Sequence, residues 1–278
     1  MFLGICRFRI LILRIIKINY LETIQLAPGK KVYFASDFHL GAPDHRKSLI
    51  REKNVCRWLD TVKADAQVVF LCGDLFDFWF EYRQTVPKGY VRLLGKIAEL
   101  SDLDIEIIIF SGNHDMWMFD YFKVELGAKV YREPQQYLIN GKKLMVGHGD
   151  GLGPGDYAYK FLKKIFENKL CRFLFGRIMH PNLGIFLGNT WAQNSWKKHE
   201  KEGDNYTYES PEKEILFKYC QEVNAVEPHD YYVFGHRHYK LDLQVAENSR
   251  YVNLGDWIVF NSYAEFDGDD LRLLDFRA

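Results

Sequence analysis

The residues of this chain that could do chemistry are acids, amides and histidines that follow short apolar runs. Asp37 and His39 come directly after the apolar run 32–35 and just before Gly41. Such a run predicts a buried strand, and the glycine predicts a sharp turn after it. Side chains two residues apart on an extended segment project to the same side, so both could reach one cation. A capping aspartate beside a surface histidine is the simpler alternative for this stretch taken alone.

Four further polar clusters follow predicted strands in the same way. They are Gly-Asp-Leu-Phe-Asp at 73–77, Gly-Asn-His-Asp at 112–115, Gly-His-Gly-Asp at 147–150 and Gly-His-Arg-His at 235–238. Because the chain holds only nine histidines, the close pair His236 and His238 is the sharpest of these signals. Taken singly, Asp74 or His148 could instead be a turn former or a hydrogen-bonded core group.

Together the clusters form a donor set that suits divalent metal ions. Carboxylate and amide oxygens combined with imidazole nitrogens favour manganese, iron, zinc or a similar ion. Two ions roughly 3.5 to 4 Å apart, sharing one bridging carboxylate, would use the whole set and would clamp a phosphoryl group. The predicted ligands are Asp37, His39, Asp74, Asn113, His148, His236 and His238.

The elements that must position these side chains are predicted to alternate between strand and helix. After the opening strand we expect a helix over 46–63, a strand over 67–72, a helix over 90–100 and a strand over 105–110. This order predicts parallel strands with right-handed crossovers, whose carboxyl ends carry the ligand-binding loops. From residue 137 the pattern changes to hairpins, beginning at the turn Asn140-Gly141.

A helical segment from about 155 to 225 is predicted to form a lid inserted into the β-rich second half. Its aromatic and aliphatic side chains alternate with lysines and arginines, as in helices that touch anionic lipid or line an acyl-chain cleft. An ordinary core-facing stripe beside a solvated row of lysines is the alternative.

Composition and the first residues set further limits. The chain has 278 residues, 47% of them hydrophobic, which is enough for one large domain, and its formal net charge of zero gives no general attraction to nucleic acid. Five widely spaced cysteines without a C-x-x-C pair favour a reducing cytoplasm. We expect the domain to span 29–278 and residues 1–28 to be an extension outside the fold or a basic, apolar segment on a membrane surface. No secretory signal or membrane span is predicted at the start.

The motifs resemble the signature of the calcineurin-like metallophosphoesterases from about residue 31 to the C-terminus. The shared elements are Asp37-x-His39, Gly73-Asp74-x-x-Asp77, Gly112-Asn113-His114-Asp115, Gly147-His148 and Gly235-His236-x-His238. The resemblance implies an α/β fold, a four-layer α/β-β-α sandwich with a dinuclear site. It assigns one metal to Asp37, His39, Asp74 and His238, and the other to Asp74, Asn113, His148 and His236, with Asp74 as the bridge.

Within that superfamily the chain is most similar to the UDP-2,3-diacylglucosamine diphosphatases, through the stretches 36–41, 73–79 and 148–152. The similarity implies hydrolysis of a UDP-sugar lipid to UMP and 2,3-diacylglucosamine 1-phosphate in lipid A biosynthesis, usually with Mn²⁺, by a peripheral protein on the cytoplasmic face of the inner membrane. The best-known proteobacterial members have arginine where this chain has His114. The implied substrate-binding residues are Asn113, His114, Asp156, Asn194, Ser195, Lys197 and Lys198.

The residue types also suggest a mechanism. A water shared by two ions, its pKa lowered toward about 7, could attack a phosphorus in line. His114 could donate a hydrogen bond or a proton to the phosphate or the leaving group, with Asp77 or Asp115 orienting nearby imidazoles. The alternative is a purely structural His114.

Two other functions are compatible with these motifs. One is a metallophosphoesterase for a soluble nucleotide or a phosphoprotein, and the other is a catalytically silent scaffold that keeps the fold. A scaffold is expected to lose ligands or the catalytic histidine, whereas every position is filled in this chain. The oligomeric state is not predicted by any of these patterns.

Overall fold

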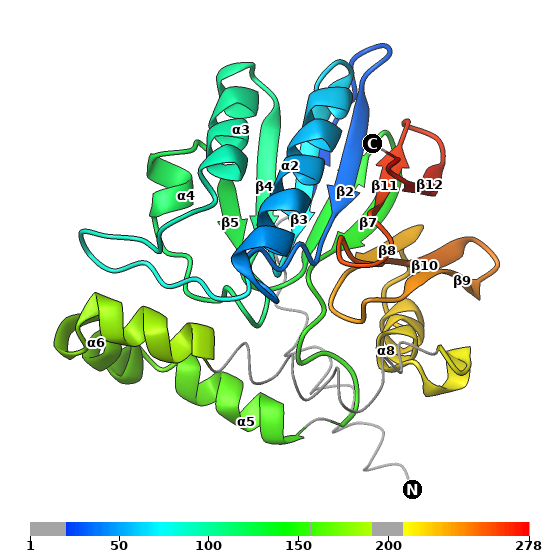
Figure 1. The fold of residues 1–278 in the computed structure, drawn as a ribbon. Coiled ribbons are helices and arrows are strands. Elements are labelled where there is room, and N and C mark those ends of the chain that lie inside the picture. The colour runs from blue at the N-terminus through cyan, green and yellow to red at the C-terminus, as the bar shows by residue number, and fades with distance from the viewer. Residues whose placement is uncertain (1–20, 156, 191–207, 278) are drawn as a thin grey trace, which may run out of the picture.

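Two six-stranded sheets lie at the centre of the protein, as the computed structural model shows (Figure 1). The structure describes residues 21–155, 157–190 and 208–277. One sheet has the strand order β12-β11-β2-β3-β4-β5, and the other has the order β1-β6-β7-β8-β10-β9. The two sheets pack face to face, because apolar side chains from both of them form one buried cluster.

The first sheet carries the strand-helix alternation that the sequence predicts. Its strands are β2 (Lys31–Ala35), β3 (Ala66–Cys72), β4 (Glu106–Phe110), β5 (Lys129–Tyr131), β11 (Ser262–Phe266) and β12 (Leu271–Asp275). β2 to β5 pair in parallel, and between them the chain forms α2 (His45–Val62), α3 (Val91–Asp102) and the short α4 (Tyr121–Val124). Asp44 starts α2 by accepting the backbone N–H of Lys47 at 2.9 Å.

Both faces of this sheet are buried, which explains its nearly continuous apolar strands. On β2, Tyr33 and Ala35 face the helical layer with Trp58 and Leu59 of α2. Phe34, on the opposite face, lies in the cluster between the sheets and stacks on Phe70 with ring centroids 4.9 Å apart. Successive side chains on a strand point to opposite faces, so one short strand joins two cores and is held rigidly.

The second sheet contains the predicted hairpin. Its strands are β1 (Glu22–Ile24), β6 (Gln135–Ile139), β7 (Lys142–Val146), β8 (Tyr231–Phe234), β9 (Lys240–Ala246) and β10 (Ser249–Leu254). β6 and β7 pair antiparallel around Asn140 and Gly141, which have φ values of 48° and 83°. Both residues are therefore left-handed, as the favoured two-residue hairpin turn requires.

The predicted boundary at residue 28 is wrong. β1 pairs in parallel with β6, and both Ile24 and Leu26 are buried in the cluster between the sheets. Three residues are too few to show a periodic pattern, so this edge strand is recognised only from its partner. The expectation for residues 1–20 lies outside the described residues.

The outer layers confirm the expected four-layer α/β architecture. α2 and α3 cover the first sheet. α8 (Ile215–Asn224), preceded by the single turn η1 (Pro211–Lys213), covers the second sheet through Leu216, Tyr219 and Val223. The sequence placed α8 inside the inserted lid, whereas its apolar stripe packs on the sandwich.

The remaining helices lie beyond the sheet edge (Figure 1). They are α5 (Tyr157–Phe166), α6 (Lys169–Ile178) and the helical residues 181–190. Asn168 starts α6 by accepting the backbone N–H groups of Leu170 and Cys171. None of the described helices is both long enough and apolar enough to cross a membrane.

Candidate metal centre

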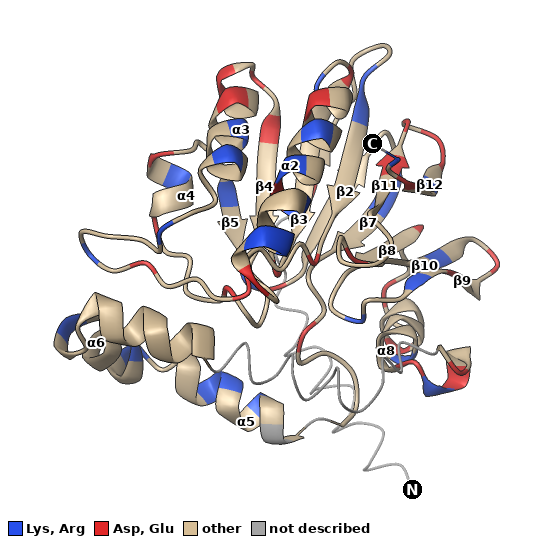
Figure 2. Ribbon diagram, in the orientation of Figure 1, with Lys and Arg blue, Asp and Glu red and all other residues tan. Residues whose placement is uncertain are grey.

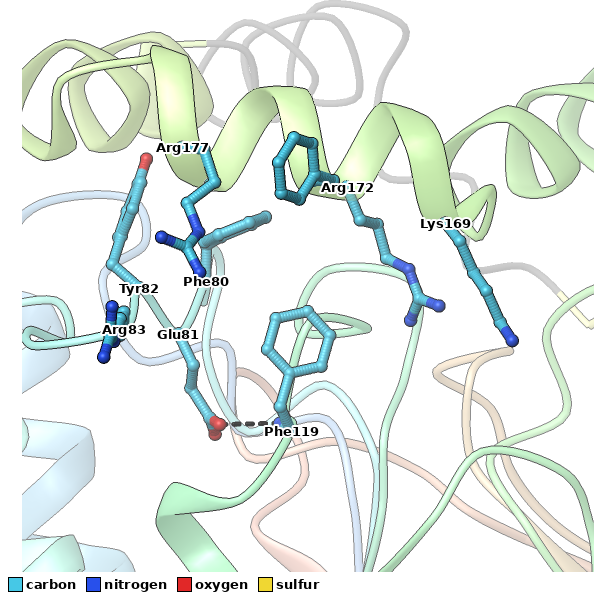
Figure 3. A pocket seen from close by; sticks show the side chains of 10 residues that line it. Phe80, Glu81, Tyr82, Arg83, Phe119, Lys169, Arg172 and Arg177 are labelled. Atoms are coloured by element: carbon cyan, nitrogen blue, oxygen red, sulfur yellow. Dashed lines mark hydrogen bonds between the residues drawn. The ribbon is translucent and has the colours of Figure 1, made fainter.

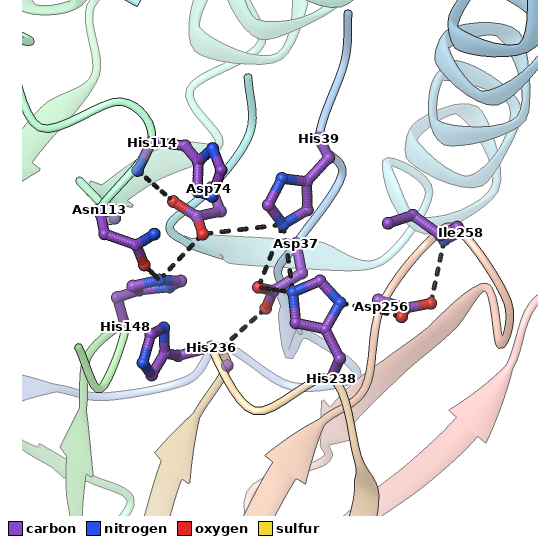
Figure 4. A network of polar contacts seen from close by, with 12 residues as sticks. Asp37, His39, Asp74, Asn113, His114, His148, His236, His238, Asp256 and Ile258 are labelled. Atoms are coloured by element: carbon purple, nitrogen blue, oxygen red, sulfur yellow. Dashed lines mark hydrogen bonds and ion pairs between the residues drawn. The ribbon is translucent and has the colours of Figure 1, made fainter. Parts of the chain in front are cut away.

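Five strands end at one edge, and the loops that follow them bring the predicted ligands together (Figure 4). β2 leads to Asp37 and His39, β3 to Asp74, β4 to Asn113, β7 to His148, and β8 to His236 and His238. The two sheets contribute to the same edge, so neither sheet alone could build this site.

The side chains form two groups with Asp74 between them. In the first group, the Nε2 atom of His238 lies 3.2 Å from His39 Nε2 and 3.3 Å from Asp37 Oδ1. The second group contains Asp74, His148 and His236. Asp74 Oδ2 lies 3.7 Å from His39 Nε2 in the first group.

His148 shows why the second group fits a cation. The Nδ1–H of its ring donates to the carbonyl oxygen of Cys72 at 2.8 Å, so in the neutral ring Nε2 carries a lone pair. That Nε2 lies 3.2 Å from Asn113 Oδ1 and 3.3 Å from Asp74 Oδ2. Three electron-pair donors thus converge on one point, which a metal ion or a proton must occupy.

The first group has the same character. The Nδ1–H of His238 donates to Asp256 Oδ2 at 3.0 Å, which leaves the lone pair of the neutral ring at Nε2 facing Asp37. Asp37 Oδ1 is buried, and no hydrogen bond reaches it from the described residues. A carboxylate is costly to bury without a compensating charge, so this donor set also fits a divalent ion.

The pKa values of Asp37 and His148 show that this site stabilises positive charge. Burial alone would raise the pKa of Asp37, but His238 and His39 hold it at about 2. Burial alone would lower the pKa of His148, but the neighbouring Asp74 raises it to about 10. Because imidazole must be deprotonated to bind a metal, loading the site releases protons.

The backbone that delivers these ligands is unusual. Asp37, His39, Asp74, His236 and His238 all have positive φ, between 43° and 68°. Residues other than glycine seldom adopt this conformation, and it persists where the surrounding structure enforces it, often at functional sites. The structure brings Asp37 and His39 close together, but the extended geometry that the sequence analysis assumed for them is wrong.

Two glycines of the motifs are needed for close approach. A Cβ atom at Gly112 would overlap the carboxylate and backbone of Asp74, and one at Gly235 would overlap Asp37 and Ser36. The glycines therefore let neighbouring loops touch directly at the carboxylates.

His114 lies beside the two groups and is the more exposed of the loop histidines from β4 and β7. Its backbone N–H donates to Asp74 Oδ1 at 2.9 Å. Its Nδ1 lies 3.0 Å from the carbonyl oxygen of Asp77 and 3.5 Å from Asp77 Oδ1. Asp77 Oδ1 also lies 3.5 Å from Nδ1 of His39. Asp77 thus faces two imidazoles, as the sequence suggested.

Asp115 has a different role from the one considered in the sequence. Its carboxylate accepts backbone N–H groups from Leu75 and Gly112, each at 2.7 Å. It therefore fastens the loop after β4 to the loop after β3. Burial, followed by repulsion from Asp74, raises the pKa of Asp115 to about 7.

Two supporting residues were missed by the sequence analysis. The buried Arg51 on α2 donates from Nη2 to the carbonyl oxygens of His39, at 2.9 Å, and of Ala42. Asp256 is fully buried and orients His238. Gly255-Asp256 directly follows β10, the same arrangement as Gly73-Asp74 after β3, so this signal was present in the sequence.

Five of the predicted substrate-binding residues lie outside the described residues. They are Asp156, Asn194, Ser195, Lys197 and Lys198.

The fold and this site define a class of protein, and sequence comparison agrees. Residues 30–240 match the family model for calcineurin-like phosphoesterases, so the chain belongs to this family and is a hydrolase.

The most informative relatives share one name. A UDP-2,3-diacylglucosamine hydrolase of Porphyromonas gingivalis is 38% identical over 257 residues, which cover 87% of this chain and 96% of the relative. Enzymes of the same name from a Shewanella species and from Histophilus somni are each 25% identical and cover 88% of this chain. They are matched over 98% and 100% of their own lengths. The similarity thus covers most of this chain and almost the whole length of these hydrolases.

Replacing Asp256 tests its role in orienting His238. Asp256→Asn should raise the dissociation constant for Mn²⁺ by about 10- to 100-fold, because the imidazole loses the carboxylate that fixes its tautomer. Isothermal titration calorimetry measures this constant. Asp269→Asn, an exposed aspartate in the turn before β12, is the matched control. Equal metal affinity in both variants would rule out this orienting role.

Proposed function

We propose that this protein hydrolyses the pyrophosphate of UDP-2,3-diacylglucosamine to UMP and 2,3-diacylglucosamine 1-phosphate, a step of lipid A biosynthesis. The observation that carries the proposal is the joint presence of two groups of metal-type ligands around Asp74 in a chain that covers 96% of a relative named for this substrate. We place the reaction at the cytoplasmic face of the inner membrane.

The metal ligands in this proposal are those predicted from the sequence. One ion is assigned to Asp37, His39, Asp74 and His238, and the second to Asp74, Asn113, His148 and His236. When bound, two such ions neutralise phosphoryl oxygens and lower the pKa of water to give a nucleophile at neutral pH. Manganese is the ion we propose, because the donor set mixes carboxylate, amide and imidazole.

His114 is proposed as the residue that transfers a proton or hydrogen bond to the substrate. Asp77 engages Nδ1, so Nε2 is the ring atom available to a phosphate oxygen or to the leaving group. Since Asp77 also contacts His39, one carboxylate holds both the candidate proton donor and a candidate ligand in place. Asn113 and His114 would therefore meet the phosphate from neighbouring positions of one loop.

The exposed lid helices support an amphiphilic substrate and a membrane surface. α5 and α6 contain basic residues and no acidic ones (Figure 2). Large apolar side chains are also exposed on them, with Phe161 65%, Phe173 58% and Ile178 75% accessible. Such a combination favours binding at the surface of an anionic bilayer.

A cavity of about 360 Å³ under α6 has the same mixed character (Figure 3). Arg172 and Arg177 point into it from α6, and Phe119 faces them from the loop below. Its single acidic residue, Glu81, is already used, because Oε2 accepts the backbone N–H groups of Phe119 and Asp120 at 2.6 and 2.8 Å. The remaining positive charge and aromatic surface suit a lipid that carries a phosphate.

The lid is also tied to the candidate metal centre. Asp150, two residues after His148, accepts a hydrogen bond from the Tyr159 hydroxyl at 2.6 Å and pairs with Lys163 Nζ at 2.8 Å. Both partners lie on α5, and Asp150 is buried. A lipid bound to the lid would therefore contact the helical layer that includes α5, and α5 in turn contacts the loop that carries His148.

A substrate comparison tests the proposed function. With Mn²⁺ present, kcat/KM for UDP-2,3-diacylglucosamine should exceed that for bis(p-nitrophenyl) phosphate and for soluble nucleotides by at least about 100-fold, because only the lipid uses both the lid and the metals. Removal of metal with EDTA should abolish turnover, and added Mn²⁺ should restore it. A preference for the soluble substrates would instead support a different phosphoesterase.

The His114→Gln variant tests proton transfer. We expect kcat to fall by about 10²- to 10⁴-fold, since glutamine cannot transfer a proton. Two ions per chain should remain, as measured by metal analysis of the purified variant. Loss of one ion would make His114 a ligand together with His39 and Asp77, which lie close enough to form such a group.

A double variant of α6 tests membrane binding. Phe173→Ser with Ile178→Ser should weaken binding to phosphatidylglycerol vesicles by about tenfold or more, because two large apolar side chains no longer enter the bilayer. Sedimentation with vesicles measures the effect. The control is Leu103→Ser with Val259→Ser, which removes side chains that are 56% and 58% accessible outside the lid. An equal loss in the control would contradict a specific role for α6.

A further inference from the structure

A second cavity, of about 240 Å³, lies directly beside the candidate metal centre. Asp77 forms part of its wall, and Asp77 Oδ1 lies 3.5 Å from Nδ1 of both His39 and His114. A group bound here would therefore be one side chain away from the proposed ligands. The rest of the wall comes from Gly41, from Asp44 and the first two turns of α2, from the segment 88–90, and from Asn189 of the helical lid residues 181–190.

Several polar side chains of this cavity are free to bind a ligand. Within the described part of the chain, no hydrogen bond or ion pair engages the side chains of His45, Lys88 or Asn189, or the hydroxyl of Tyr90. Together they offer an imidazole, an ammonium group, an amide and a phenol. The imidazole, the amide and the phenol both donate and accept hydrogen bonds, and the ammonium group donates them.

Tyr90 is held in place for such a contact. Its ring packs on Phe76, with centroids 4.8 Å apart, and its hydroxyl lies so close to Gly41 that a Cβ atom there would be only 2.8 Å away. Tyr90 itself has φ of 57°, although its side chain makes no capping bond to α3. Packing thus fixes the position of a hydroxyl that has no partner among the described residues.

The charges around the cavity exclude a phosphate and favour a neutral polar group. Three acidic residues, Asp44, Glu52 and Asp77, line it against one lysine and one histidine. Two of these carboxylates are hydrogen-bonded to backbone N–H groups. Asp44 accepts the N–H of Lys47, and Glu52 accepts the N–H of Arg92. The cavity has no surplus of positive charge with which to hold an anion. In this respect it differs from the basic, aromatic cavity under α6.

We propose that this cavity binds the nucleoside of the substrate, a pyrimidine base with its ribose. Base edges and ribose hydroxyls need mixed donors and acceptors, which these side chains supply, and the adjoining metal centre would hold the attached phosphate. The volume suits a base and a sugar and is too small for acyl chains. This inference rests on the proposed function, and it assigns the two unlike ends of that substrate to two unlike cavities.

Two soluble esters with the same leaving group test the assignment in the full-length protein with Mn²⁺. The probes are uridine 5′-(p-nitrophenyl) phosphate and bis(p-nitrophenyl) phosphate. The ratio of their kcat/KM values should favour the uridine ester by about tenfold or more. Tyr90→Phe and Asn189→Ala should each reduce this ratio by about five- to tenfold, the effect of one lost hydrogen bond.

Matched variants away from the cavity are the controls. Tyr263→Phe, on β11, and Asn54→Ala, on α2, make the same chemical changes elsewhere and should keep the ratio of the parent. Uridine itself, which has no phosphate, gives a second measurement. Saturation-transfer NMR without added metal should show its binding to the parent and weaker binding to Tyr90→Phe.

The outcomes separate this inference from the proposed function. A parent with no preference for the uridine ester, variants with the ratio of the parent, or an equal loss of both activities would overturn the nucleoside site. A preference for the uridine ester that depends on Tyr90 would support it even if UDP-2,3-diacylglucosamine is not hydrolysed. That last result would reject only the lipid substrate.

Discussion

The burial of two carboxylates beside several imidazoles is the constraint on which this structure depends. Asp37 and Asp74 are almost inaccessible to water, and the side chains around them direct electron pairs toward the same two points. Without a positive charge at those points, the cost of burial would oppose folding of the loops. Divalent ions would supply this positive charge, and they also carry out the chemistry of the family.

The sandwich provides the rigidity that such an arrangement requires. Five ligand-type residues adopt a backbone conformation that is unfavourable for side chains with a Cβ. The loops are held in it by Asp115, Arg51 and Asp256, each of which is buried and engages backbone or imidazole atoms. Strands buried on both faces anchor the ends of these loops. The strain is therefore offset by packing some distance from the reacting groups.

Around this rigid centre the surroundings differ strongly in polarity. The helices α5 and α6 combine exposed apolar side chains with lysines and arginines, whereas the cavity beside Asp77 is polar and has no excess of positive charge. An amphiphilic substrate with a nucleoside at one end and acyl chains at the other matches both environments. Asp150 joins α5 to the loop that carries His148, so the lid also contacts the candidate metal centre.

Local patterns in the sequence determined the metal-type residues, the parallel strands and the hairpin, because each depends on neighbours within a few positions. Tertiary structure alone decided the rest. β1 is a strand only because β6 lies beside it, and α8 belongs to the sandwich because its apolar stripe meets the second sheet. The left-handed backbone of Asp37 and His39 and the buried contacts of Arg51 are set by packing in the folded protein. The cavity that Asp77 shares with Asn189 joins segments distant in the chain. Spacing along a sequence carries no information about such contacts until the sheets bring those segments together.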